Sequence, residues 1–153
     1  MHKRVMDPAD DGSGEELILA VEYMLRHIRR SATTGGLSTA ASAVLARLDS
    51  EGPQRLTELA RAEAVSQPNM TQLVTRLERA GLVRRTADHS DGRAVVVVVT
   101  PTGVEVCRQR RAERARALQD LIADLPESER RAVNIALPAL ARAIDHQGRT
   151  ASP

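Results

Sequence analysis

The sequence predicts a mainly α-helical fold of the α+β class, in which a single β-hairpin interrupts a series of helices. Apolar residues recur at helical spacing in several segments, the first of which covers residues 15–31. Strand-forming residues instead gather in one region, where five consecutive valines begin at Val95. Tyr23 is the only aromatic residue, so aliphatic side chains must form the core, which suits packed helices.

Length and composition indicate one domain, which we expect at residues 15–145. The polar segments 1–14 and 147–153 are expected to be flexible ends. The formal net charge is +2, and Lys3 is the only lysine, so nearly all of the positive charge comes from arginine. Arginine suits phosphate and guanine edges, but the codon bias of a GC-rich genome explains the same composition equally well.

Cysteine content and hydropathy predict a soluble cytoplasmic protein. A single cysteine, Cys107, excludes an internal disulfide and is compatible with a reducing compartment. The longest apolar run, residues 94–99, is too short to span a bilayer, and the N-terminus lacks the apolar stretch of a signal peptide. We therefore expect no membrane partner.

Three helices are predicted in the first part of the chain. The first covers residues 15–31, where apolar residues recur every three or four positions. Ser38 is a suitable N-cap for a second helix, which ends before Gly52. A third, shorter helix fits residues 57–64.

The fourth predicted helix, residues 66–80, has one apolar and one polar side. Ser66 is a suitable N-cap, Pro68 lies in the first turn, where its missing N–H costs little, and Gly81 is a usual C-terminal residue. The apolar stripe consists of Met70, Leu73, Val74 and Leu77. The polar side consists of Gln67, Asn69, Thr71, Gln72, Thr75 and Arg76.

The segments 82–86 and 94–100 are predicted to pair as a β-hairpin. Both favour strands, and the connector 87–93 is rich in turn-forming residues. A single buried strand is the alternative for the valine run, but the neighbouring strand favours the hairpin.

Two more helices are predicted after the hairpin. Thr102 and Glu105 have the spacing of a capping box at the start of a long helix that extends toward Asp124. Apolar residues at spacings of 4, 3 and 4 predict a last helix over residues 127–145, which Pro138 is expected to kink.

The helices 57–64 and 66–80 match a helix-turn-helix, in which the second helix enters the major groove of DNA. Amide side chains can pair with adenine edges, and Arg76 can reach guanine or phosphate. Arg93, at the end of the hairpin loop, is expected to probe the minor groove; an ion pair with Asp91 that braces the loop is the alternative. A solvated surface is the alternative for the polar side of this helix. The helix before it and the hairpin after it favour a winged helix-turn-helix instead.

Three consecutive runs resemble the MarR family of bacterial regulators: LVTRLERAGLVRR at residues 73–85, DGRAVVVVVT at residues 91–100, and the PTGVEV that follows. The specific parts are the Asp91-x-Arg93 wing, the Val99-Thr100 strand end and Gly103. The resemblance covers about residues 15–145 and implies six helices with a two-stranded wing. It assigns residues 53–100 to a DNA-binding lobe, and residues 15–33 and 102–145 to helices that intertwine in a homodimer.

The resemblance implies a repressor that binds an inverted-repeat operator, because a two-fold dimer requires two half-sites about 34 Å apart. An activator is the alternative. Gln72 stands where the family commonly has arginine, which predicts a different base preference. The residues expected to contact double-stranded DNA are Ser66, Gln67, Pro68, Asn69, Thr71, Gln72, Thr75, Arg76, Asp91 and Arg93.

The resemblance also implies release from DNA by a small effector, often aromatic or phenolic, bound between the dimer helices and the DNA-binding lobe. Tyr23, His27 and Arg30 are the candidate lining residues by position. A surface histidine without a ligand is the alternative for His27, and the near absence of aromatic residues leaves no basis for naming an effector. For Cys107 we favour buried packing over a role as an oxidant sensor.

Two other classes of function are less well supported. An enzyme is disfavoured because Asp88, His89, Ser90 and Asp91 are adjacent in a turn and do not converge as a catalytic triad does. No second pair of ligands accompanies them, so we expect no metal and no cofactor. A winged helix that binds only protein is the second alternative, and steep salt dependence of DNA binding distinguishes the two.

Overall fold

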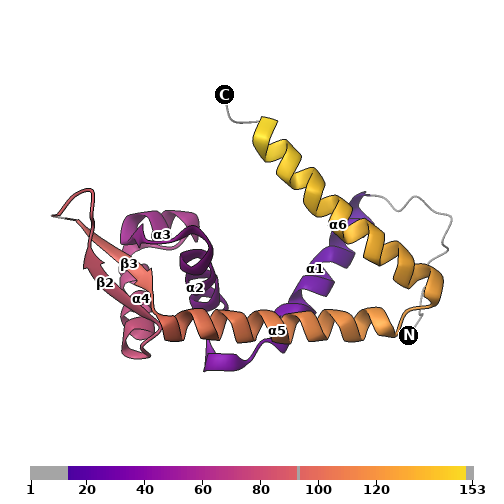
Figure 1. Ribbon diagram of the computed structural model, residues 1–153, viewed down its shortest axis with the longest axis horizontal. Coiled ribbons are helices and arrows are strands. Elements are labelled where there is room, and N and C mark those ends of the chain that lie inside the picture. The colour runs from indigo at the N-terminus through magenta and orange to yellow at the C-terminus, as the bar shows by residue number, and fades with distance from the viewer. Residues whose placement is uncertain (1–13, 93, 151–153) are drawn as a thin grey trace. The chain divides into compact units, whose positions relative to one another are not determined.

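The computed structural model describes residues 14–92 and 94–150, and it confirms the mainly α-helical fold with one hairpin (Figure 1). The chain divides into two compact units, Met1–Arg114 and Ala115–Pro153, with the boundary inside the fifth helix. The elements are α1 (Gly14–Ser31), a 3₁₀ turn η1 (Thr34–Gly36), α2 (Thr39–Glu51), β1 (Gln54–Arg55), α3 (Leu56–Ala62), α4 (Gln67–Arg79), β2 (Val83–Ala87), β3 (Val95–Val99), α5 (Pro101–Ala123) and α6 (Glu127–Thr150).

The hydrophobic core lies in the first unit and is entirely aliphatic apart from sulfur. Side chains from α2, α3, α4, β2, β3 and the start of α5 form it. The predicted apolar stripe of α4 is buried, which fixes the rotation of this helix about its axis. The side chains with the least exposed surface are Leu45, Leu48, Leu59, Met70, Val44, Val74, Val83 and Val97.

The sheet has three strands in the order β1-β3-β2, and both pairings are antiparallel. The predicted hairpin is confirmed, with Val83 opposite Val99 and Ala87 opposite Val95. The expectation of only two strands was incomplete, because β1 pairs with the other edge of β3. The valine run is therefore the central strand, and it buries Val96 and Val97 while Val95 at its start is exposed.

Three predicted helix ends are confirmed by local hydrogen bonds. The Ser38 hydroxyl accepts from Ala41 N at 3.2 Å, and the Ser66 hydroxyl accepts from Asn69 N at 3.4 Å. After α4, Gly81 adopts a φ of 74°, and the following amide, Leu82 N, donates to the Leu77 carbonyl at 3.0 Å. This left-handed residue closes the helix in a Schellman motif.

The predicted capping box between Thr102 and Glu105 was wrong. The helix α5 begins at Pro101, and the cap is Thr100, whose hydroxyl accepts from Gly103 N at 3.1 Å and donates to the Gly81 carbonyl at 2.6 Å. A proline at the first helical position needs no N–H partner. The carboxylate of Glu105 instead binds Arg108.

Two other helix boundaries differ from the predicted ones. The third helix covers Leu56–Ala62, because the Glu58 carboxylate accepts from Arg55 N at 2.7 Å and starts the helix one residue earlier. The last helix, α6, continues through Pro138 as far as Thr150, beyond its predicted end at residue 145.

Candidate nucleic-acid interface

A helix-turn-helix is formed by α3 and α4, which are joined by residues 63–66. Ala64 in this turn has a φ of 52°, in the left-handed region that non-glycine residues adopt rarely. The turn is held by the amide of Val65, which donates to the Ala60 carbonyl at 3.0 Å. Leu59 and Ala60 are buried, so α3 is anchored beneath the turn and fixes where α4 begins.

The exposed side of α4 carries most of the predicted DNA-contact residues. Since the opposite stripe is buried, the helix cannot rotate, and its polar residues are held at the surface. Thr75 is only half-buried, whereas the others are exposed. We call this surface the α4 polar face; its members are Ser66, Gln67, Pro68, Asn69, Thr71, Gln72, Thr75 and Arg76.

Some polar groups of the α4 polar face are hydrogen-bonded within the protein, whereas others are not. The hydroxyl of Thr71 donates to the Gln67 carbonyl at 3.0 Å, and the hydroxyl of Thr75 donates to the Thr71 carbonyl at 2.8 Å. The side-chain amides of Gln67, Asn69 and Gln72 have no hydrogen-bond partner among the described residues. The three amides are therefore the groups best able to donate and accept at a base edge.

An ion pair that the sequence did not reveal joins β2 to α4. The guanidinium of Arg85 binds the Glu78 carboxylate and also donates to the Thr75 hydroxyl at 3.1 Å. The backbone amide of Arg85 donates to the same carboxylate at 3.1 Å. Thr75 is thus held from both sides, and the strand β2 is fixed against the helix that carries the polar face.

The wing comprises β2, β3 and the loop between them, and Arg55 braces its base. Arg55 Nη2 lies 2.8 Å from Asp88 Oδ2 and 3.8 Å from Asp91 Oδ2. The Asp88 carboxylate also accepts from the amide and the hydroxyl of Ser90. Hydrogen bonds from Arg55 and Ser90 hold the pKa of Asp88 at about 2.

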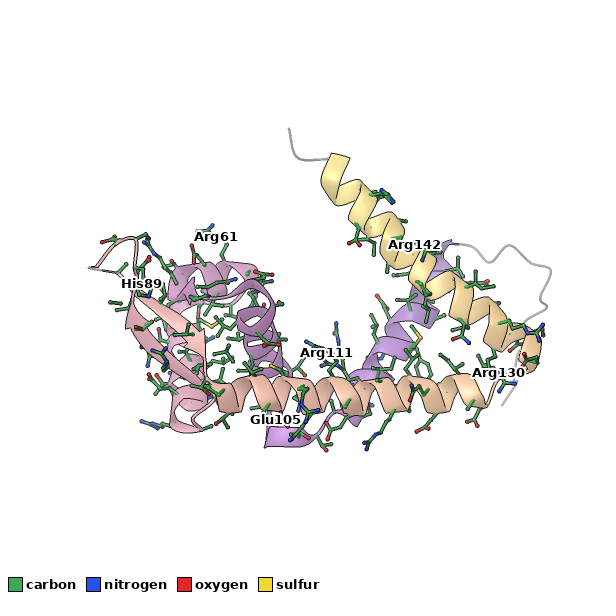
Figure 2. All side chains as sticks on the ribbon, viewed as in Figure 1. Arg61, His89, Glu105, Arg111, Arg130 and Arg142 are labelled. Atoms are coloured by element: carbon green, nitrogen blue, oxygen red, sulfur yellow. The ribbon has the colours of Figure 1, made fainter. Side chains whose placement is uncertain are left out.

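This arrangement gives the loop residues a structural role. Asp88 holds the loop through its bonds to Arg55 and Ser90. The next residue, His89, is exposed on the wing (Figure 2). Asp91, predicted to contact DNA, is exposed and lies near Arg55. Arg93, the predicted minor-groove probe, lies outside the described residues.

The comparisons with known proteins agree on one family. A sequence profile of the MarR family matches residues 37–95. An HTH-type transcriptional regulator from Mycobacterium tuberculosis is 30% identical over 137 residues, which cover 90% of this chain and 96% of its own. The chain belongs to the MarR family. As a member it is a DNA-binding transcriptional regulator, and its named relatives are regulators rather than enzymes.

Solved structures support the assignment to the MarR family. A transcriptional regulator from Thermotoga maritima matches with a TM-score of 0.75 at 26% identity, covering 88% of this chain and 96% of its own. A further relative, matched by sequence, is an HTH-type transcriptional regulator from Bacillus subtilis, which is 30% identical over 103 residues, 67% of this chain and 64% of its own. The resemblance seen in the sequence is therefore confirmed.

The first unit contains an arginine-lined hollow of about 760 Å³ beside α1, α2 and α5, the helices for which the MarR resemblance implies an effector pocket. It is formed by α1, α2, α4, α5 and the segments that connect them. Arg30 is one of its lining residues, whereas Tyr23 and His27 are exposed on α1 and do not line it. The arginines that give the hollow its name are Arg29, Arg30, Arg110 and Arg114.

Cys107 is buried against the core, and this burial raises the pKa of its thiol. A reactive thiol needs a lowered pKa, so the arginines nearby do not make this cysteine a sensor of the thiolate type. In residues 14–92 and 94–150 no cluster of three potential metal ligands occurs. No helix in that part of the chain is long and apolar enough to cross a membrane.

Proposed function

We propose that the protein is a homodimeric repressor that binds an inverted-repeat operator through the α4 polar face and the wing, and that a small effector releases it. The observation that carries this proposal is the α4 polar face. Three amides without internal partners stand on a helix whose opposite side is locked in the core. A helix fixed in this way can present the same groups to the major groove at every encounter.

The chemistry of these groups favours particular contacts. Asparagine and glutamine amides can bond adenine N6 and N7 in pairs, so Gln67, Asn69 and Gln72 are the proposed base readers. In the proposal, the exposed Arg76 binds guanine or phosphate, Pro68 at the start of the helix contacts bases, and Ser66 contacts bases or backbone. The two threonines, whose hydroxyl protons are committed within the helix, act as acceptors or through their methyl groups.

Exposed apolar surface on α1 and α6 supports dimerisation. No residue of α1 is buried, and Leu17, Ile18 and Leu19 each expose more than half of their surface. On α6, Ile135 and Ile144 are about 70% exposed. Apolar surface of this extent is seldom left in water, and a second copy of the chain is the occupant we propose for residues 15–33 and 102–145.

Structures of a staphylococcal relative support the DNA and effector parts of the proposal. A mutant of MepR from S. aureus is described bound to an oligodeoxyribonucleotide, with a TM-score of 0.63 to this chain at 18% identity. MepR is also described bound to ethidium bromide, with a TM-score of 0.58. At this identity the likeness establishes the fold, and the two activities are proposals for this chain.

Selection of bound duplexes from a random DNA pool, followed by fluorescence anisotropy, tests the DNA contacts. We expect an inverted repeat to be enriched and Gln72→Ala to weaken its binding about 5- to 150-fold, the worth of one paired base contact. Gln109→Ala is the matched control, because Gln109 is an exposed amide on α5, away from the α4 polar face. Equal losses in both variants, or no enriched site, would contradict the proposed interface.

Light scattering tests the proposed dimer surface. We expect a dimer for the native chain and a monomer for the double variant Ile135→Glu, Leu140→Glu, because buried carboxylates without partners are costly. Asn134→Glu on the same helix adds a charge at an exposed polar position and is expected to leave the dimer intact. A dimeric double variant would refute the role of α6. A reporter gene behind the selected operator then tests repression, which predicts lower expression when the protein is present.

A further inference from the structure

Two buried polar atoms point to a ligand in the arginine-lined hollow. Across the described residues, Arg110 Nε and Ser42 Oγ are the buried side-chain nitrogen and oxygen atoms that have no hydrogen-bond partner. Both residues line the same hollow, one from α5 and the other from α2. Unsatisfied buried donors are costly, so their occurrence at a single cavity calls for an acceptor that binds there.

The geometry of the Arg110 guanidinium shows which kind of acceptor fits. Arg110 is 7% exposed, and its Nη1 donates to the Thr34 carbonyl at 2.8 Å. The other edge, formed by Nε and Nη2, has no acceptor in the described part of the chain. In Arg55 and Arg108 this same edge binds a carboxylate through both nitrogens, at distances of 2.6 to 3.3 Å. A carboxylate is therefore the group that matches Arg110.

The charges around the hollow favour an anion. Four arginines line it against one acidic residue, Glu63, whose carboxylate is engaged by Arg47 at 2.9 Å. Glu113, the acid nearest to Arg110 along α5, is committed to the amide and the hydroxyl of Thr34, at 3.2 and 2.6 Å. These bonds lower the pKa of Glu113, and the positive charge of Arg110 lowers it further, although no hydrogen bond joins the two side chains in the described part of the chain.

The rest of the lining determines the body of the ligand. The non-polar side chains are alanines and the aliphatic or sulfur-containing residues Leu37, Val44, Val65, Met70 and Leu73. The lining contains no aromatic ring to stack against a planar ligand. A volume of about 760 Å³ falls within the range of small-molecule sites, roughly 300 to 1,000 Å³.

We infer that this hollow binds a small aliphatic monocarboxylate, whose carboxylate accepts from the Nε–Nη2 edge of Arg110 and from the Ser42 hydroxyl. Met70 and Leu73 connect this site to the DNA, because they lie on the buried side of α4 and also line the hollow. A ligand seated there pushes on the base of the helix that carries the polar face. This consequence rests on the proposed function, whereas the binding of the carboxylate does not.

Isothermal titration with two probes of equal shape tests the inference. Cyclohexanecarboxylate carries the proposed group on an aliphatic ring, and cyclohexanecarboxamide is its neutral counterpart. We expect the native protein to bind the carboxylate about tenfold or more tightly than the amide, since hydrogen bonds to charged groups are the stronger ones. Benzoate, the aromatic counterpart, is expected to bind no better than cyclohexanecarboxylate.

Variants locate the site. Arg110→Lys keeps a positive charge but lacks the forked edge, and we expect it to lose most of the preference for the carboxylate. Ser42→Ala is expected to weaken binding without disturbing the Thr34 turn. Arg111→Lys is the matched control, because Arg111 is the exposed neighbour on α5, is paired with Asp49 and does not line the hollow. Circular dichroism of each variant establishes that it is folded.

The outcomes separate this inference from the proposed function. Equal affinity for the acid and the amide, no binding at millimolar concentration, or binding unchanged in Arg110→Lys and Ser42→Ala would each overturn the inference. DNA binding is measured separately by anisotropy, with and without cyclohexanecarboxylate. If the carboxylate binds at Arg110 but the protein binds no DNA, the inference stands and the proposed function fails. If the carboxylate binds but leaves DNA affinity unchanged, the regulatory consequence fails alone.

Discussion

Replacing Gly103 with alanine tests how closely α5 packs against the end of α4. An ideal Cβ at this position lies 2.1 Å from the Leu82 carbonyl oxygen and 2.7 Å from Val99 Cγ2, where ordinary contacts begin at about 3.4 Å. The first turn of α5 must therefore move by about 1 Å, because the nearest obstacle is backbone. Overpacking of this kind typically costs about 1–3 kcal/mol.

Two further effects nearly cancel. The same Leu82 carbonyl accepts from Thr100 N at 3.0 Å, and losing that bond costs about 1 kcal/mol. Alanine in a helix gains up to about 1 kcal/mol over glycine. The unfolding free energy of Gly103→Ala should thus fall by about 2 kcal/mol.

Urea denaturation followed by circular dichroism, at one fixed protein concentration, measures this loss. Gly14→Ala is the matched control, because Gly14 is the first residue of α1 and nothing lies within 4 Å of its ideal Cβ. Its unfolding free energy should change by less than about 0.5 kcal/mol. A Gly103→Ala variant as stable as the native protein would refute the close approach between α5 and Leu82.

Three other predictions address DNA binding, acid stability and the core. Arg76→Ala should reduce the slope of log affinity against log salt by about one, whereas Arg111→Ala should leave it unchanged, since Arg111 is paired with Asp49. The low pKa of Asp88 means that its charged form stabilises the folded wing above about pH 4, and that this stability is lost as the pH falls toward 2. Acid titration of the unfolding free energy should therefore show a smaller fall for Asp88→Asn than for the native chain. Leu45→Ala, at a fully buried position, should lower the unfolding free energy by about 2–5 kcal/mol in urea denaturation.

The parts of the fold that could be predicted from the sequence depend on local signals. The caps at Ser38 and Ser66 involve bonds across three residues, and the Gly81 turn requires a backbone angle that glycine adopts freely. The apolar stripe of α4 has a helical period, which predicted both its buried side and its polar face. Local chemistry was sufficient in each of these cases.

The features that were missed depend on contacts between distant parts of the chain. The strand β1 has only two residues, and it exists because the edge of β3 is available to pair with it. Thr102 and Glu105 had the spacing of a capping box, but Thr100 lies against the Gly81 carbonyl and starts the helix instead. No local rule distinguishes the two threonines, because the deciding contact comes from a residue 19 positions away.

The braces of the candidate site were missed for the same reason. Arg55 and Asp88 are 33 positions apart, and many arginines in this sequence could pair with that carboxylate. The effector-pocket residues predicted from the sequence were limited for a different reason. An amphipathic helix such as α1 shows which residues share a side, but not whether that side faces a hollow or a second copy of the chain. Arg30 lines the hollow, whereas Tyr23 and His27 are exposed on the same helix.

Ion pairs with carboxylates help to distinguish two explanations for the high arginine content, namely genome composition and binding function. Genome composition can supply arginines, but it does not determine which of them lack a carboxylate partner. Arg76 on the α4 polar face has no ion pair among the described residues, and neither do the four arginines of the hollow. An exposed arginine is solvated by water whether or not it has a carboxylate partner. The missing ion pair of Arg76 therefore does not distinguish genome composition from function. Arg110 is different, because its guanidinium is buried, no carboxylate binds it directly in the described part of the chain, and its Nε has no acceptor there, which is costly. Genome composition does not explain why this arginine is buried with one edge unbonded, whereas a ligand that accepts from that edge does. Among residues 14–92 and 94–150, the arginines that have carboxylate partners are Arg47, Arg55, Arg85, Arg108, Arg111, Arg130 and Arg131.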